Sequence, residues 1–200
     1  EIAVTPIQLA NMTAAIANRG YFYTPHIIKR INDEPINNPK YTNKNYTTIA
    51  AKHFEPVVQG MNEVYNSGTA KYVQVPGIEM CGKTGTVENF TKINGVRRQL
   101  TDHSVFIAFA PKDDPKIAIA VFIENGYWGS RYAAKIASLL VEKYLKGTIT
   151  RTDLEDYLLT HSLEYEYAKK LSAEPFKINE AMDQGLITIE KENSLKQLID

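Results

Sequence analysis

Residues 80–89 read MCGKTGTVEN and set an ammonium group, a hydroxyl group and a bare backbone side by side at Lys83, Thr84 and Gly85. Met80, Cys81, Thr86 and Val87 on either side of them are apolar or β-branched, which is typical of a strand. A substrate peptide can lie along the edge of a strand and pair with its backbone. There Lys83 would place a positive charge beside the reacting bond, Thr84 would offer a hydroxyl to a carboxylate, and Gly85 would let a second backbone approach. The backbone N–H of Thr86 would face a developing oxyanion.

The Lys-Thr-Gly tripeptide alone does not establish this chemistry, because so short a motif also occurs where a strand merely ends. The sequence that follows supplies partners for the strand. Residues 103–111, HSVFIAFAP, and residues 116–125, KIAIAVFIEN, are nearly continuous apolar runs, typical of strands covered on both faces. The polar turn PKDDPK between them predicts an antiparallel hairpin. Residues 90–102 connect the first strand to the second and contain an Asn94-Gly95 turn signal.

A helix is predicted at the start of the chain, in VTPIQLANMTAAIANRG at residues 4–20. Thr5 is its expected N-cap, Pro6 fits the first helical position, and Gln8 completes a capping box. Gly20 suits the left-handed C′ position at the other end. The pattern therefore defines both ends of this helix.

Two more helices and a loop complete the patterned part of the chain. Residues 55–70, EPVVQGMNEVYNSGTA, predict a helix that breaks near Ser67 and Gly68, whereas residues 32–46, rich in Asn and Pro, predict a surface loop. Residues 130–147, SRYAAKIASLLVEKYLKG, predict a third helix that ends at Gly147. Its expected buried stripe consists of Ala133, Ala137, Leu140, Val141 and Tyr144.

Composition narrows the classes of function. Of 200 residues, 44% are hydrophobic and 23% are charged, and 23 Lys and Arg balance 23 Asp and Glu, so the net charge is zero. A neutral chain gives no electrostatic indication of nucleic acid or an acidic membrane as a partner. The single cysteine, Cys81, excludes an internal disulfide. The longest apolar runs, VFIAFA and IAIAVFI, are too short to span a bilayer.

The patterning predicts two regions. Residues 1–150 contain the predicted strands and the three helices, and residues 151–200 form a charged helical tail in which we recognise no chemistry. The chain begins at Glu1, next to a helix start, without a methionine. We therefore expect it to be a piece of a longer protein.

Several motifs in the same order resemble one enzyme family. CGKTGT at residues 81–86 is followed by an apolar strand, a hairpin and a helix, and it is preceded by VTPIQLANMTAAIANRGYFYTPHI and GMNEVYNSGTA. Together these segments resemble the C-terminal half of the transpeptidase domain of class B penicillin-binding proteins, whose third signature is Lys-Thr-Gly. They are most similar to penicillin-binding protein 2, the branch that serves cell elongation. The resemblance covers roughly residues 1 to 147.

The resemblance implies an α/β fold of the α+β type, in which helices flank an antiparallel sheet, as in penicillin-recognising serine transpeptidases and β-lactamases. This chain would hold only the C-terminal half of that fold. Lys83, Thr84 and Gly85 match the family's third catalytic motif, and Thr86 matches the position whose amide helps to form the oxyanion hole. No metal and no organic cofactor is implied.

The family's two other catalytic motifs are absent from this sequence. The first is Ser-x-x-Lys, in which the lysine activates the nucleophilic serine, and no serine here has a lysine three positions later. The second is Ser-x-Asn, and no copy of it occurs. Thr188–Lys191 and Tyr41–Asn43 imitate the two motifs, but each stands at the wrong place in the chain order. We expect both motifs to lie upstream of Glu1, so that this chain alone lacks a nucleophile.

The parent enzyme implied by the resemblance cross-links peptidoglycan on the periplasmic side of the bacterial inner membrane, held by an anchor that is not in this chain. A serine attacks the D-Ala-D-Ala bond of one stem peptide, and an amine of a second stem resolves the acyl-enzyme. β-Lactams would be covalent inhibitors. The resemblance also implies a membrane glycan polymerase of the RodA type as a partner.

Two alternative functions stay open at this point. One is a related enzyme of the same fold: a β-lactamase, a D,D-carboxypeptidase or a β-lactam sensor. The other is a non-catalytic binding module that has kept the fold and lost its nucleophile. The helix at residues 4–20 favours the transpeptidase over the related enzymes, and the residues upstream of Glu1 would decide between the transpeptidase and the binding module.

Other residues suggest weaker hypotheses. Tyr127 and Trp128, in ENGYWGS after the last strand, either border the substrate groove or simply cover the edge of the sheet. His103, Asp102 and Cys81 could be metal ligands, but they lack a ligand spacing such as C-x-x-C. Cys81 is two residues before Lys83, on the same face of the strand, and we expect it to be a small buried residue.

Overall fold

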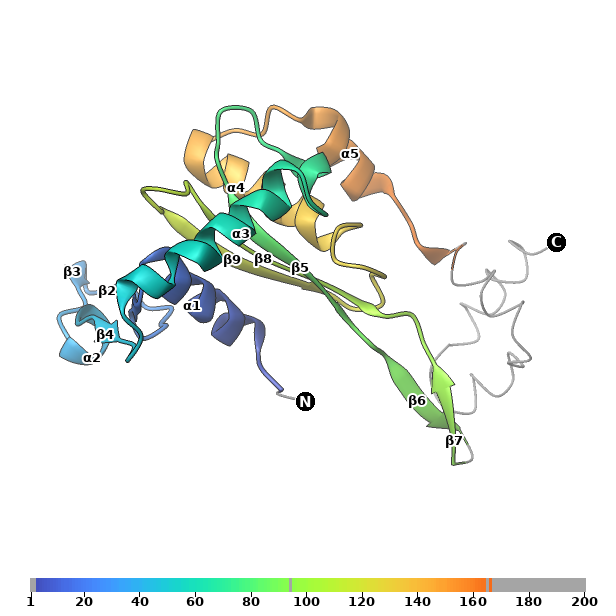
Figure 1. Cartoon of the computed structure of the whole chain (residues 1–200), viewed down its shortest axis with the longest axis horizontal. Helices are drawn as coiled ribbons and strands as arrows, with labels where there is room; N and C mark the ends of the chain where they lie inside the picture. Colours follow the sequence, from blue (N-terminus) through green and yellow to red (C-terminus); the bar gives the residue numbers. More distant parts are fainter. Residues whose placement is uncertain (1–2, 94, 165, 167–200) are drawn as a thin grey trace. The chain divides into compact units, whose positions relative to one another are not determined.

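The computed structural model describes residues 3–93, 95–164 and 166 (Figure 1). The chain forms two compact units, Glu1–Glu155 and Asp156–Asp200. A helical tail was predicted for residues 151–200. Its first part forms α5 (Thr152–Thr160), and residues 165 and 167–200 of that prediction lie outside the described residues. Within the described residues, no helix combines the length and apolar character that crossing a membrane requires.

Three antiparallel strands form the central sheet in the order β5–β8–β9 (Figure 1). They are β5 (Cys81–Val87), β8 (His103–Ala110) and β9 (Ile117–Ile123). The register pairs Lys83 with Ile107 and Gly85 with Val105. All three predicted strands and the predicted β8–β9 hairpin are confirmed. β5, which carries the Lys-Thr-Gly motif, lies at an edge of the sheet as the structure describes it.

A second hairpin connects β5 to β8, as the Asn94-Gly95 turn signal predicted. β6 (Phe90–Ile93) pairs with β7 (Val96–Gln99), and Gly95 in the turn has a φ of +78°. A left-handed φ of this kind suits glycine because it has no Cβ. Figure 1 shows this hairpin extending beyond the end of the central sheet.

Helices cover both faces of the sheet, which explains why β8 and β9 are apolar at nearly every position. α4 (Ala133–Lys146) packs against Phe106, Ala108 and Ala110 of β8. The alternate residue Phe109 points to the opposite face, where it clusters with residues of α1 (Pro6–Ala17) and α3 (Glu55–Asn66). Because successive side chains of a strand point to opposite faces, a strand covered on both sides needs apolar residues at nearly every position.

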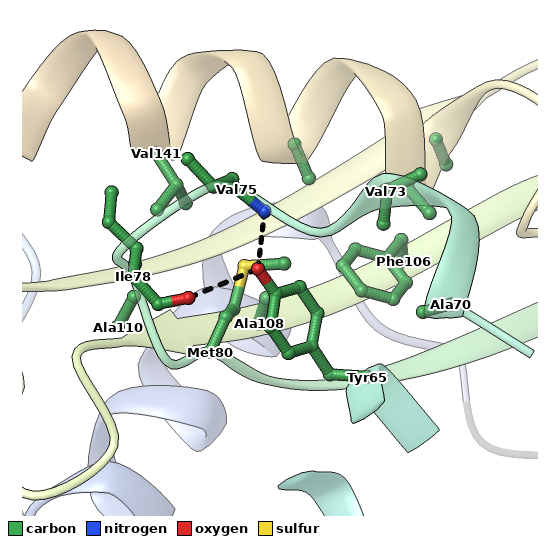
Figure 2. Packing of buried hydrophobic residues seen from close by; sticks show 13 residues of the cluster. Tyr65, Ala70, Val73, Val75, Ile78, Met80, Phe106, Ala108, Ala110 and Val141 are labelled. Atoms are coloured by element: carbon green, nitrogen blue, oxygen red, sulfur yellow. Dashed lines mark hydrogen bonds between the residues drawn. The ribbon is translucent and has the colours of Figure 1, made fainter. Parts of the chain in front are cut away.

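The first of these cores also contains the segment that precedes β5 (Figure 2). The Tyr65 hydroxyl of α3 accepts a hydrogen bond from the Val75 N–H and donates one to the Ile78 carbonyl oxygen at 3.1 Å. Figure 2 shows this hydroxyl between the two backbone groups, with Met80 beside it. Burial raises the pKa of Tyr65 above its ordinary value, so the phenol stays protonated and keeps both hydrogen bonds. These two hydrogen bonds connect α3 to the segment that precedes β5.

The capping box of α1 is confirmed, but its C-terminal prediction is displaced by one residue. The Gln8 side chain accepts a hydrogen bond from the Thr5 N–H at 2.8 Å. At the other end, the left-handed C′ residue is Arg19, with a φ of +54°, and Gly20 follows it with a φ of +115°. Arg19 takes this position because its guanidinium donates to the carbonyl oxygens of Ala17 and Lys112 and pairs with Glu55 at 3.1 Å. These contacts offset the cost of a left-handed non-glycine residue.

The predicted loop at residues 32–46 contains short regular elements, so that prediction is wrong in part. They are α2 (Pro39–Thr42), β3 (Glu34–Pro35) and β4 (Asn45–Tyr46), of which β3 pairs with β2 (Arg30–Ile31) and β4 with β1 (Tyr21–Phe22). The Asn38 side chain caps α2 by accepting from the Lys40 N–H at 3.0 Å, and Pro39 follows it. Asn and Pro, which indicated a loop, here start a short helix.

The buried face of α4 also differs from the prediction. Ala133, Ala137 and Val141 are buried as expected, but Leu140 and Tyr144 are 48% and 62% exposed. Ser138 and Glu142 are buried in their place, beside small alanines that let the helix approach the sheet closely. Periodicity assigns a glutamate to solvent, and it cannot foresee a glutamate that is buried with its partners. Gly147 ends the helix in the left-handed conformation, as predicted.

Glu142 is the centre of a buried ionic network. Its carboxylate accepts from the Thr150 hydroxyl at 2.6 Å and from the Arg151 Nε at 2.9 Å, and its side chain is 0% exposed. The Arg151 Nη1 also donates to the Val73 carbonyl oxygen in η2 (Lys71–Val73) at 3.2 Å. Burial opposes ionisation of Glu142, but the hydrogen bonds from Thr150 and Arg151 outweigh it and hold the pKa of Glu142 below its ordinary value. The network joins α4 to the segment before α5 and to η2.

We expect Arg151→Met to destabilise the protein by about 3 kcal/mol near neutral pH, because it leaves a buried carboxylate without its guanidinium. Since the pKa of Glu142 is lowered by folding, the stability it contributes is present above about pH 4.3 and is lost as the pH falls through the lower folded value. The difference in unfolding free energy between wild type and variant should therefore shrink in acid. Denaturant unfolding at several pH values measures it. Adding Glu142→Leu to Arg151→Met should recover part of the loss, and a loss independent of pH would contradict this account.

Candidate active site

The four residues of the predicted site are consecutive on β5. Lys83, Thr84, Gly85 and Thr86 pair with Ile107, Phe106, Val105 and Ser104 of β8, in that order. Lys83 is exposed, and its Nζ donates to the Thr84 carbonyl oxygen at 2.8 Å. The ammonium group is therefore held beside the strand and remains accessible to a ligand.

The Thr84 hydroxyl has a partner that sequence reasoning missed. Thr69 Oγ1 lies 2.9 Å from Thr84 Oγ1, and either hydroxyl can be the donor. Thr69 belongs to the NSGTA segment at residues 66–70, which follows α3. The sequence marks this segment as the break of a helix and as part of the family resemblance, but no local pattern shows that its hydroxyl meets β5.

Gly85 differs from its neighbouring glycines in what surrounds it. A Cβ atom added to Gly82 would lie 2.4 Å from Cζ of the buried Phe106, so Gly82 is required by packing. The three atoms nearest to a Cβ added to Gly85 all belong to Val105, at 3.4 Å or more, which is ordinary van der Waals contact. Packing within the described residues therefore does not require a glycine at position 85.

Tyr127 and Trp128 lie in the loop between β9 and α4, and that loop contacts β5. A Cβ atom added to Gly129 would lie 2.3 Å from the Val105 carbonyl oxygen and 2.6 Å from that of Gly85, so the loop backbone rests directly on these two strands. The Ser104 hydroxyl holds the loop by donating to the Trp128 carbonyl oxygen at 3.0 Å. Trp128 is 53% exposed. Both aromatic residues therefore lie close to the Gly85 end of the motif.

The three residues considered as metal ligands are not brought together. Cys81 pairs with Phe109 and His103 with Val87, at opposite ends of the β5–β8 ladder and about 20 Å apart along the strands. His103 Nδ1 accepts a hydrogen bond from the Asn125 N–H at 3.0 Å, and Asp102 accepts from Gln99 at 2.9 Å. Among the residues that the structure describes, no three His, Cys, Asp or Glu side chains are grouped to hold a metal ion.

Cys81 is a core residue, as predicted. It is 0% exposed and packs in the cluster with Ala17, Met61 and Phe109. Burial raises the pKa of its thiol to about 12. The thiolate is the reactive form of cysteine, so this thiol is inert at neutral pH.

Comparison with known proteins assigns the chain to a family. The family described as "Penicillin binding protein transpeptidase domain" matches residues 2–142. The chain belongs to the penicillin-binding protein transpeptidase family. The predicted α/β fold, an antiparallel sheet flanked by helices, is the fold of this family's transpeptidase domain and is confirmed.

The penicillin-binding proteins most similar to this chain are peptidoglycan enzymes. The chain is 32% identical over 189 residues to the peptidoglycan D,D-transpeptidase MrdA of Haemophilus influenzae, a match that covers 88% of this chain and 28% of that protein. The chain also superposes on the solved structure of penicillin-binding protein 2 of Pseudomonas aeruginosa in complex with WCK 5153, with a TM-score of 0.58 and 30% sequence identity. This match covers 74% of this chain and 32% of the other. The predicted resemblance to class B penicillin-binding proteins, and to penicillin-binding protein 2 among them, is confirmed.

A third similar protein carries a covalent β-lactam. Penicillin-binding protein A of Mycobacterium tuberculosis, solved as a ceftriaxone acyl-enzyme complex, gives a TM-score of 0.59 at 27% identity, covering 72% of this chain and 33% of that one. Our chain thus spans about a third or less of the length of the penicillin-binding proteins it matches.

Proposed function

We propose that this chain carries the Lys-Thr-Gly side of the active site of a serine-type peptidoglycan D,D-transpeptidase. We call the whole enzyme the parent protein, meaning these 200 residues together with the rest of the transpeptidase domain and the membrane anchor that the resemblance implies. One observation carries the proposal: an edge strand presents an accessible ammonium, a hydroxyl and a glycine that packing does not require, in a chain of this family. An edge strand of this kind suits a substrate that binds as an added strand.

In this proposal each residue of the motif on β5 has a separate role in the reaction. Lys83 stabilises negative charge near the reacting carbonyl, and Thr84 donates its hydroxyl to the substrate carboxylate. Gly85 lets the substrate backbone approach, and the Thr86 N–H donates to the oxyanion. A serine elsewhere in the parent protein supplies the nucleophile.

The proposed chemistry proceeds in two steps. The serine oxygen bonds to the carbonyl carbon of the D-Ala-D-Ala peptide bond of one stem peptide, and the terminal D-Ala leaves as a protonated amine. The amine of a second stem peptide then attacks the ester and restores the serine hydroxyl, which gives the cross-link. β-Lactams acylate the same serine and are inhibitors, a view that the ceftriaxone acyl-enzyme of the Mycobacterium tuberculosis relative supports.

The names of the most similar proteins favour a transpeptidase over a β-lactamase, a carboxypeptidase or a sensor. We place the parent protein in the bacterial inner membrane with this domain on the periplasmic side, where peptidoglycan is cross-linked. A membrane glycan polymerase of the RodA type is the partner we propose from the resemblance to penicillin-binding protein 2. Tyr127 and Trp128 border the substrate groove in this proposal, because their loop rests on β5 at Gly85.

Gly85→Val in the parent protein tests whether the substrate backbone passes over this strand. The valine branches would occupy the space of the approaching backbone, and a forced contact of this kind costs about 1–3 kcal/mol, so acylation by a labelled penicillin should slow by about 5- to 150-fold. The melting temperature should change little, because the atoms nearest to a Cβ at this position, those of Val105, are no closer than 3.4 Å. Stopped-flow acylation and thermal melting measure the two effects.

Gly82→Val is the matched control, since it makes the same substitution on the same strand. It forces a Cβ against Phe106, and it should lower the melting temperature by more than Gly85→Val does. If Gly85→Val lowers the melting temperature as much as Gly82→Val does, and acylation falls with it, then Gly85 is needed for packing and not for the substrate.

A further inference from the structure

Among the residues that the structure describes, Thr69 is the one polar side chain from outside β5 that has a hydrogen bond to a side chain of the Lys-Thr-Gly motif. The bond joins Thr69 Oγ1 to Thr84 Oγ1 at 2.9 Å, a good distance for a pair of hydroxyls. Thr84 is half-buried on β5, and Thr69 is exposed. The pair therefore lies at the border between the folded core and the space that a ligand of β5 would occupy.

The backbone that carries Thr69 is fixed by the end of α3. The Gly68 N–H donates to the Glu63 carbonyl oxygen at 2.9 Å, and the Ala70 N–H donates to that of Val64 at 3.0 Å. A Cβ atom on Gly68 would lie 2.7 Å from the Val64 Cα, so only glycine fits this tight turn, and Ala70 beyond it is fully buried. The turn therefore presents Thr69 to Thr84 from a rigid support.

A count of protons shows what this pair can do. Two hydroxyls bring two protons, and the bond between them uses one, so one O–H remains to bind a third group. If Thr69 donates to Thr84, the remaining proton belongs to Thr84 and is directed away from Thr69. A hydroxyl that accepts a hydrogen bond is also polarised toward being a better donor.

We propose that Thr69 is a positioning residue that donates to Thr84 Oγ1 and thereby directs the Thr84 proton toward the substrate carboxylate. The inference rests on the proposed function, because it assigns that carboxylate to Thr84. Lys83 beside the pair favours an anion at this place, and an anion accepts hydrogen bonds and donates none. A bound carboxylate thus selects the arrangement in which Thr69 is the donor.

The test is a double-mutant cycle in the parent protein, read as the second-order rate of acylation by penicillin. Thr69→Val removes the hydroxyl and keeps the shape, and it should slow acylation about 3- to 10-fold, the loss expected for one neutral hydrogen bond. Thr69→Ser keeps the hydroxyl and should restore the rate. In a Thr84→Val background, Thr69→Val should add almost nothing, because Thr69 acts through Thr84.

The methyl ester of the same penicillin separates positioning from a structural role. The ester lacks the carboxylate charge, so it should acylate the wild-type protein more slowly than the free acid does. Thr69→Val should lower the acylation rate of the ester by a much smaller factor than that of the free acid. A structural role would slow both compounds equally and would lower the melting temperature, and that result would overturn the inference. Equal rates for wild type and Thr69→Val with the free acid would also overturn it. If Thr84→Val and Lys83→Ala are themselves without effect, it is the proposed function that fails.

Discussion

Lys83→Ala in the parent protein is expected to slow acylation by penicillin about 100-fold or more, the usual cost of removing one preorganised electrostatic contact from an active site. The fold should be unaffected, because Lys83 is exposed and its recorded hydrogen bond, at 2.8 Å, goes to the carbonyl oxygen of the next residue. The rate constant for loss of free labelled penicillin, together with the melting temperature, measures both parts of this expectation. Unchanged acylation would remove Lys83 from the mechanism.

Lys71→Ala is the matched control for Lys83→Ala. Lys71 is an exposed lysine in η2, soon after Thr69 in the chain, and its Nζ lies 4.9 Å from the centre of the Tyr72 ring. Removing its charge changes the net charge as much as Lys83→Ala does, but Lys71 is not on β5, and solvent and salt weaken the effect of an exposed charge that does not contact the ligand. We therefore expect Lys71→Ala to change acylation less than about threefold. A similar loss in both variants would mean that net charge, and not the place of Lys83, controls the rate.

The sequence predicts the sheet well because burial on both faces leaves a simple signal. In β8 and β9 nearly every residue is apolar, and a run of this length between turn residues predicts a covered strand without knowledge of what covers it. The short polar turn then determines that these strands are antiparallel neighbours. The Lys-Thr-Gly site was found for a related reason: its residues are consecutive, so one strand suffices to bring them together.

Features that depend on partners distant in the chain could not be predicted in this way. Glu142 is buried because Arg151 and Thr150 neutralise and bind it, and Arg19 tolerates a left-handed backbone because carbonyl groups and Glu55 hold its side chain. The Thr69–Thr84 contact joins the end of a helix to a strand 15 positions later. None of these pairs produces a periodic pattern in the sequence, because each depends only on two particular side chains coming into contact after folding.

The largest expected effect concerns the nucleophile. Incubated with a labelled penicillin, this 200-residue chain should form no covalent adduct, whereas the parent protein should gain the mass of one acyl group per chain. Lys83, Thr84 and the Thr86 amide can bind and polarise a β-lactam, but none of them replaces a serine held beside its own lysine. Loss of a serine nucleophile typically lowers turnover by a factor on the order of 10⁶ and leaves no covalent intermediate. Intact-mass spectrometry after the same incubation compares the two proteins.

Ser67 is a serine near the proposed site, because it stands two positions before Thr69 in the chain. Its hydroxyl already donates to the Glu63 carbonyl oxygen at 3.3 Å and lies 3.4 Å from the Glu63 carboxylate, and no lysine stands three positions after it. Ser104 and Ser138 are fully buried and cannot reach a ligand without unfolding. A stoichiometric adduct on the short chain that disappears in Ser67→Ala would identify Ser67 as the nucleophile. The site would then be complete within these residues, and a serine supplied by the rest of the domain would no longer be needed.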